Sequence, residues 1–96
     1  MLLTSFKNKM KAIIKQYREL KGCYPDAILI FRTESDYQCY NEDAEITTQV
    51  LGITLIKRAK NSLSSFPHSM LDKYLPKLVR AGHRVAICEP LSKSLI

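Results

Sequence analysis

The feature of this 96-residue chain that most constrains its fold is the continuous apolar run AILIF at residues 27–31. The run is rich in strand formers, and it is bounded by Pro25 on one side and by the polar stretch TESD on the other. A short apolar run in such a setting is typical of a strand that is buried on both faces. The sequence therefore predicts a sheet with this segment as a buried, central strand.

Two segments on either side of this strand carry helical patterns. Between residues 4 and 21, apolar side chains recur at steps of three and four residues, and Gly22 and Pro25 end the predicted helix. Asn41 is placed to cap a second helix that ends at Gly52. The side chains expected on the inward face of the second helix are Ala44, Thr47, Val50 and Leu51.

A third helix is predicted between Ser69 and Gly82. Ser69 and Asp72 approximate a capping box at its start. Pro76 is expected to kink this helix or to confine it to a short start, because proline lacks the amide hydrogen of a helix interior. The expected apolar stripe consists of Leu71, Leu75, Leu78 and Val79.

The stretch YQCY at residues 37–40 predicts a second strand, paired in a hairpin with the first. Strand alternation places Tyr37 and Cys39 on one face, which we expect to be the core, and Gln38 and Tyr40 on the other. Stacking of the tyrosines on nucleic-acid bases is the alternative interpretation.

Three other segments complete the predicted fold. Residues 53–59 (ITLIKRA) predict a third strand, residues 60–65 (KNSLSS) a loop, and residues 84–88 (RVAIC) a last buried strand. Helices and strands alternate along the chain without an intervening linker. The expected fold class is α/β, a small mixed sheet flanked by about three helices, in one domain over residues 1–96.

The charge of the chain is unevenly distributed. The formal net charge of +6 favours anionic partners, and basic residues gather in the first helix, at residues 57–60 and at residues 73–84. Residues 33–56 contain no basic side chain, and this window holds the acids Glu34, Asp36, Glu42, Asp43 and Glu45. Two partner classes stay open: nucleic acid at the basic clusters, or a basic protein at the acidic window.

Several functional classes are excluded by what the sequence lacks. No run of about 18 apolar residues is present, and the first residues lack the features of a signal peptide, so no membrane partner is expected. Three widely spaced cysteines fit neither a disulfide framework nor a metal knuckle, and they favour a reducing cytoplasm. His68 and His83 have no further ligands at metal spacing, so no metal or other cofactor is expected. No nucleophile motif or converging carboxylates are found, so no enzyme is predicted.

Four stretches together resemble a known family: KQYRELK, YPDAILIFR, EDAEITTQVLGITLIKR and FPHSMLDKYLPKLVRAGHRVAICE. In amino-acid sequence and in order along the chain, they resemble the N-terminal mismatch-recognition domain, domain I, of the MutS family of DNA mismatch-repair proteins, over residues 10–90. The resemblance implies a small mixed sheet wrapped by helices. It also implies a domain that touches a mismatched base pair from the minor groove.

The resemblance places the reading element of the family at ESDYQCY, residues 34–40. Where the family has a glycine followed by the reading motif Phe-x-Glu, this chain has Glu34 in the glycine position, Asp36 in the phenylalanine position and Gln38 in the glutamate position. A side chain that wedges between bases needs an apolar face to replace the stacking it breaks. Asp36 has no such face, so family-style mismatch reading is expected to be lost.

The expected function is therefore a free-standing, non-catalytic module that binds double-stranded DNA weakly, through phosphates, without selecting mismatches. The side chains expected to contact DNA are Arg32, Lys57, Arg58 and Lys60. The Lys57–Arg58 pair matches a family position near the DNA backbone; the alternative is a solvated strand end. The ATPase domain of the family and its phosphate-binding loop are not found here, so ATP is not expected to bind this chain. The alternative function is a protein–protein interaction module that keeps the fold and no longer binds DNA.

Overall fold

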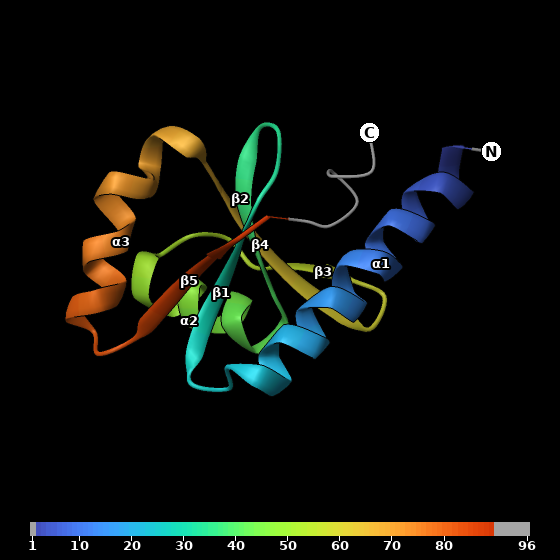
Figure 1. The fold of residues 1–96 in the computed structure, drawn as a ribbon. Coiled ribbons are helices and arrows are strands. Elements are labelled where there is room, and N and C mark those ends of the chain that lie inside the picture. Colours follow the sequence, from blue (N-terminus) through green and yellow to red (C-terminus); the bar gives the residue numbers. More distant parts are fainter. Residues whose placement is uncertain (1, 90–96) are drawn as a thin grey trace.

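The computed structural model describes residues 2–89, with side chains from residue 11 onward. These residues form one five-stranded mixed sheet, in the order β3-β4-β2-β1-β5, with three α-helices around it (Figure 1). The strands are β1 (Ala27–Arg32), β2 (Asp36–Tyr40), β3 (Ile56–Arg58), β4 (Asn61–Pro67) and β5 (Arg84–Cys88). The helices are α1 (Leu2–Cys23), α2 (Asn41–Leu51) and α3 (Leu71–Arg80), the last preceded by the 3-10 turn η1 (His68–Met70). The predicted α/β class is confirmed.

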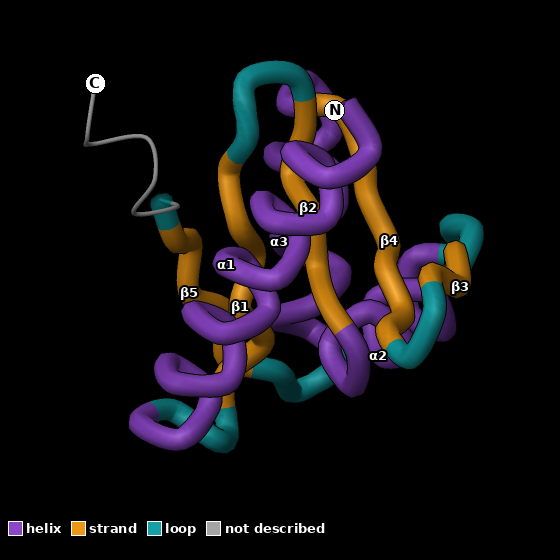
Figure 2. Tube along the Cα trace, turned by 90° about the vertical axis from the view of Figure 1, so that its right-hand side faces the viewer, coloured by secondary structure: helices purple, strands orange, loops and turns teal. Residues whose placement is uncertain are grey.

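The apolar run forms the central strand β1, as predicted. This strand pairs antiparallel with β2 and parallel with β5, and four of its side chains are at most 2% exposed. Leu29 and Phe31 pack beneath α1, whereas Ile28 and Ile30 belong to the core between the sheet and the helices α2 and α3. Figure 2 shows α1 lying across one face of the sheet. Each buried side chain of this size contributes roughly 1.5–3 kcal/mol, so both faces of β1 exclude polar residues.

The β1–β2 hairpin and the burial of Tyr37 and Cys39 are also confirmed. Tyr40 is buried as well, on the opposite face, where its ring lies 6.0 Å from that of Tyr17 on α1 and 5.5 Å from that of Phe31. Burial raises the pKa of the Cys39 thiol to about 12, so this thiol stays protonated at neutral pH. Both faces of β2 therefore contribute to the core.

The prediction of a loop at residues 60–65 is wrong, because most of this segment belongs to β4, which pairs with both β3 and β2. Ser62 and Ser64 are buried, and the Ser64 hydroxyl lies 2.7 Å from the hydroxyl of Thr47 on α2. Small hydroxyl side chains let α2 approach the strand, and the hydrogen bond between Ser64 and Thr47 satisfies these two hydroxyls in the interior. A strand with polar inward residues lacks the apolar alternation on which strand prediction depends.

The predicted cap of the second helix is wrong. The N-cap is Tyr40 without a side-chain hydrogen bond, and Asn41 is the first residue of α2 with a φ of 51°. The Asn41 side chain turns to β4 instead: it accepts a hydrogen bond from the Ser62 amide at 2.9 Å and donates one to Asn61 Oδ1 at 3.2 Å. Asn41 thus ties the start of α2 to the start of β4. Gly52 ends α2 with a φ of 74°, as predicted.

The third helix also differs from its prediction. Ser69 lies within η1, and α3 begins after Met70 with no side-chain cap. The helix continues through Pro76, and of the predicted stripe Leu78 is fully buried while Val79 is 55% exposed. The predicted apolar stripe thus includes one residue, Val79, that is turned away from the core.

Two strand predictions need smaller corrections. The strand expected at residues 53–59 is confined to Ile56–Arg58, since the residues before it connect α2 to the sheet. The last strand, β5, is only partly buried: it lies at an edge of the sheet, and its Ile87 is 45% exposed. An apolar strand sequence does not distinguish an edge from an interior position.

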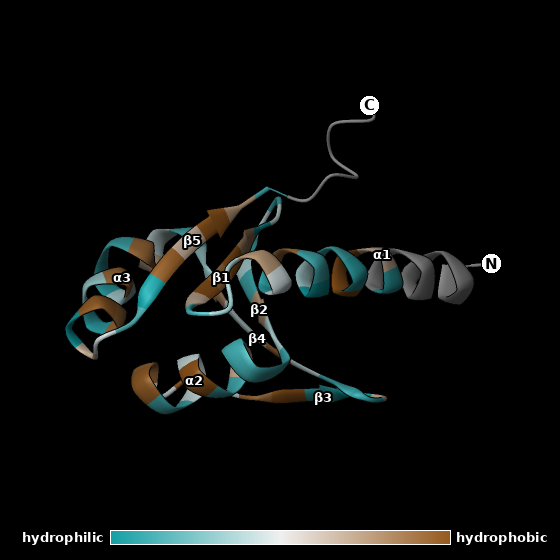
Figure 3. Cartoon of the chain, turned by 60° about the horizontal axis from the view of Figure 1, so that its bottom comes forward, coloured by the Kyte–Doolittle hydropathy of each residue, from teal (hydrophilic) through white to brown (hydrophobic). Residues whose placement is uncertain are grey.

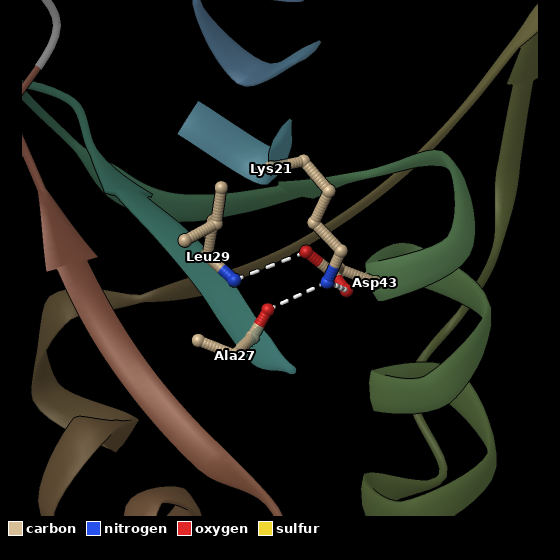
Figure 4. Close-up of polar contacts among 4 residues, drawn as sticks. All are labelled: Lys21, Ala27, Leu29 and Asp43. Atoms are coloured by element: carbon tan, nitrogen blue, oxygen red, sulfur yellow. Dashed lines mark hydrogen bonds and ion pairs between the residues drawn. The ribbon is translucent and has the colours of Figure 1, made fainter. Parts of the chain in front are cut away.

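A buried ion pair joins α1, β1 and α2 (Figure 4). Asp43 is fully buried, and its carboxylate accepts hydrogen bonds from Lys21 Nζ at 2.8 Å and from the Leu29 amide at 3.0 Å. Lys21 Nζ also donates to the carbonyl oxygen of Ala27 at 2.6 Å. Asp43, one of the five acids of the acidic window at residues 33–56, is therefore part of the core.

Within residues 2–89, no helix has the length and hydrophobicity needed to cross a membrane.

Candidate nucleic-acid interface

The basic cluster lies on the β3–β4 hairpin at one edge of the sheet. Lys57 and Arg58 are exposed on β3, and Ala59 and Lys60 form a two-residue turn, closed by the pairing of Arg58 with Asn61. Figure 3 shows the hydrophilic character of this turn. Since residues paired across strands share a face, Lys57 points to the α2 side with Ser62, and Arg58 points to the α1 side. The two cations therefore lie on opposite faces of the hairpin, at the edge of the sheet.

Ala59 adopts a φ of 52°, a left-handed conformation that costs about 1–2 kcal/mol for a residue with a Cβ. We expect Ala59→Gly to raise the free energy of unfolding by about 1 kcal/mol, because glycine adopts this conformation without the steric cost. Urea unfolding monitored by circular dichroism measures the change. Lys60→Gly, in the same turn at a residue without positive φ, is the matched control and is expected to give no stabilisation.

The predicted reading element, residues 34–40, comprises the turn between β1 and β2 and the whole of β2. The Thr33 amide donates to the Asp36 carbonyl oxygen at 2.8 Å and closes the turn, whose central residues Glu34 and Ser35 are exposed. The Thr33 hydroxyl donates to the Asp36 carboxylate at 2.5 Å and accepts a hydrogen bond from the Asp36 amide at 3.1 Å. Asp36 therefore serves as a turn-stabilising residue.

A ladder of side-chain hydrogen bonds continues along β2 from Asp36. Gln38 Nε2 donates to the Asp36 carboxylate at 3.3 Å, and Gln38 Oε1 accepts from the Tyr40 hydroxyl at 2.7 Å. Burial raises the pKa of Tyr40 well above its usual range, which keeps the hydroxyl a donor. Both ends of the Gln38 amide are thus occupied by neighbours on the same strand.

The structure places the two predicted parts of the interface at opposite ends of β4. Asp36 pairs with Pro67 at one end of this strand, and Arg58 pairs with Asn61 at the other. Six residue steps of about 3.3 Å separate these pairs, a distance of roughly 20 Å. Arg32 is exposed at the end of β1, beside the reading-element turn and far from Lys57, Arg58 and Lys60.

The acidic window does not form one surface. Asp43 is buried in the ion pair with Lys21, and Asp36 is bound by Thr33 and Gln38. Glu34 is exposed in the β1–β2 turn, whereas Glu42 and Glu45 are exposed on α2. The proximity of these acids in the sequence is therefore not proximity in space.

Sequence reasoning missed the role of His68. Pairing of β4 with β2 brings His68, the residue after β4, against the β1–β2 turn. Its Nε2 atom lies 2.8 Å from the Thr33 carbonyl oxygen and 3.0 Å from that of Asp36. No local pattern could reveal this contact, because 32 residues separate His68 from Asp36.

Comparison with known proteins identifies the family. Residues 11–95 match the family model described as MutS domain I. The DNA mismatch repair protein MutS of Porphyromonas gingivalis is 50% identical over 84 residues, which cover 82% of this chain and 9% of that protein. The MutS proteins of Phocaeicola vulgatus and Flavobacterium johnsoniae are 52% and 49% identical, over 82% and 86% of this chain and 10% of each relative. The chain spans about a tenth of the length of these relatives. These matches confirm the family that the sequence motifs indicated, and the chain belongs to the MutS domain I family.

Proposed function

We propose that this chain is a non-catalytic DNA-binding module that contacts duplex phosphates and does not select mismatches. The relatives are named DNA mismatch repair proteins, which supports DNA as the partner. Two groups of exposed cations supply the charges for phosphate contacts. One group lies on the β3–β4 hairpin and consists of Lys57, Arg58 and Lys60, and the other is Arg32 at the end of β1. In this proposal the module acts in the cytoplasm, and its own residues bind no ATP.

The observation that carries the loss of mismatch selectivity is the hydrogen-bond ladder along β2. A reading residue has to present a free apolar face or a free polar group to the displaced base. Asp36 is charged and bound to Thr33, and the Gln38 amide is bound to Asp36 and Tyr40. Using Gln38 to read a base requires breaking two internal hydrogen bonds, each worth about 0.5–1.5 kcal/mol net.

We expect the affinity for a mismatched duplex to exceed that for a matched duplex by no more than about threefold. Aromatic–base stacking is typically worth about 1–3 kcal/mol, and about 1.4 kcal/mol corresponds to tenfold in affinity, so a chain that lacks this interaction lacks strong selectivity. Fluorescence anisotropy with matched and mismatched duplexes of equal length measures both affinities. A wild-type preference of tenfold or more for the mismatch contradicts the proposal.

The double substitution Asp36→Phe with Gln38→Glu restores the two family reading residues. If this variant gains a mismatch preference that the wild type lacks, the β1–β2 turn faces DNA and only its reading residues differ. Ser35→Ala, a change at an exposed residue of the same turn, is the control for unspecific effects on the turn.

The alternative function, a protein-interaction module, requires the acids of the acidic window to form one surface for a basic partner. Because Asp43 is buried and the remaining acids are divided between the β1–β2 turn and α2, no single acidic surface supports that alternative. Absence of wild-type binding to duplex DNA even at low salt would favour that alternative again.

A further inference from the structure

We propose that His68 is a positioning residue that holds the β1–β2 turn, and thereby Arg32, in the geometry that contacts DNA. The inference rests on the proposed DNA contact of Arg32. His68 approaches the turn from the end of β4, and its Nε2 atom lies within hydrogen-bond distance of two carbonyl oxygens, those of Thr33 and Asp36. Carbonyl oxygens only accept hydrogen bonds, so Nε2 carries a proton and donates to both.

The imidazole ring is itself held in place from the core. Tyr37, which is 7% exposed, contacts the ring of His68 edge to face at a centroid distance of 4.9 Å. Tyr37 also pairs with Arg32 across the hairpin. A single chain of contacts therefore runs from the core through Tyr37 and His68 to both ends of the turn.

The position of the turn matters because opposite charges lie close together on it. Arg32 and Glu34 are both exposed and are separated by one residue, Thr33, whose carbonyl oxygen accepts the hydrogen bond from His68. Phosphate attracts Arg32 and repels Glu34, so the affinity depends on which side chain the turn directs toward the DNA. A turn held in one geometry also avoids the entropic cost of ordering it upon binding.

The test compares three variants. His68→Phe keeps an aromatic ring against Tyr37 and removes the donor; His68→Gln restores a donor without the ring; His83→Phe removes the other histidine, which lies outside the turn. The first measurement is amide hydrogen exchange of Thr33 and Asp36 in the absence of DNA, because both amides are hydrogen-bonded within the turn. The second is the dissociation constant for a matched duplex.

For His68→Phe we expect faster exchange of the two turn amides and a rise in the dissociation constant of about three- to tenfold. His68→Gln is expected to restore part of both, and His83→Phe to change neither. Unchanged exchange in His68→Phe overturns the role of His68 in holding the turn. Faster exchange with unchanged affinity overturns its role in DNA binding. If the wild type binds no DNA, the proposed function fails and the positioning role with it, while the exchange data still report whether His68 holds the turn.

Discussion

Asp43→Ala is expected to lower the free energy of unfolding by about 3–5 kcal/mol, because it removes one partner of a buried ion pair. The substitution leaves Lys21 without its partner and the buried amide of Leu29 without an acceptor. Lys21 is only partly buried and keeps its hydrogen bond to the Ala27 carbonyl oxygen, but its charge then lacks a counterion. Urea unfolding at constant pH measures the loss, which is a large fraction of the stability of a small domain.

Glu45→Ala is the matched control, since it removes a carboxylate from the exposed side of the same helix and is expected to change stability by no more than about 0.5 kcal/mol. Asp43→Asn keeps an acceptor for the Leu29 amide and loses the charge, so an intermediate loss is expected. A loss below about 1 kcal/mol for Asp43→Ala means that Lys21 relaxes into solvent and that the pair does not hold α1 to the sheet.

Affinity for duplex DNA is expected to fall about a hundredfold between 50 and 200 mM monovalent salt. The estimate follows from counterion release, with a slope of about −0.9 per phosphate neutralised and four proposed contacts, those of Arg32, Lys57, Arg58 and Lys60. Fluorescence anisotropy across a salt series measures the slope. Lys57→Ala with Arg58→Ala is expected to reduce its magnitude by about 1.8.

Lys73→Ala with Arg80→Ala is the matched control, because it removes the same two charges from exposed positions of α3. Its slope is expected to stay close to that of the wild type. Equal slopes for the two double variants contradict the assignment of Lys57 and Arg58 as contact residues, since net charge alone then accounts for the binding. A salt-independent affinity contradicts phosphate binding altogether.

The sequence by itself determined the elements that depend on local patterns. The run at residues 27–31 predicted the central strand because a strand buried on both faces tolerates no polar residue. Apolar spacing predicted α1, and Gly52 marked the end of α2 because its left-handed conformation favours glycine. The motifs of the chain also led to the family, which the comparisons confirm.

The tertiary structure alone decided which polar residues are buried and which distant residues meet. The serines of β4 form a strand because α2 covers them, and Asp43 is a core residue because Lys21 and the Leu29 amide satisfy its charge. The same holds for His68, whose contact with the β1–β2 turn depends on the register between β4 and β2. Local composition cannot encode these outcomes, because the cost of burying a polar group depends on partners that only the folded chain brings within hydrogen-bond distance.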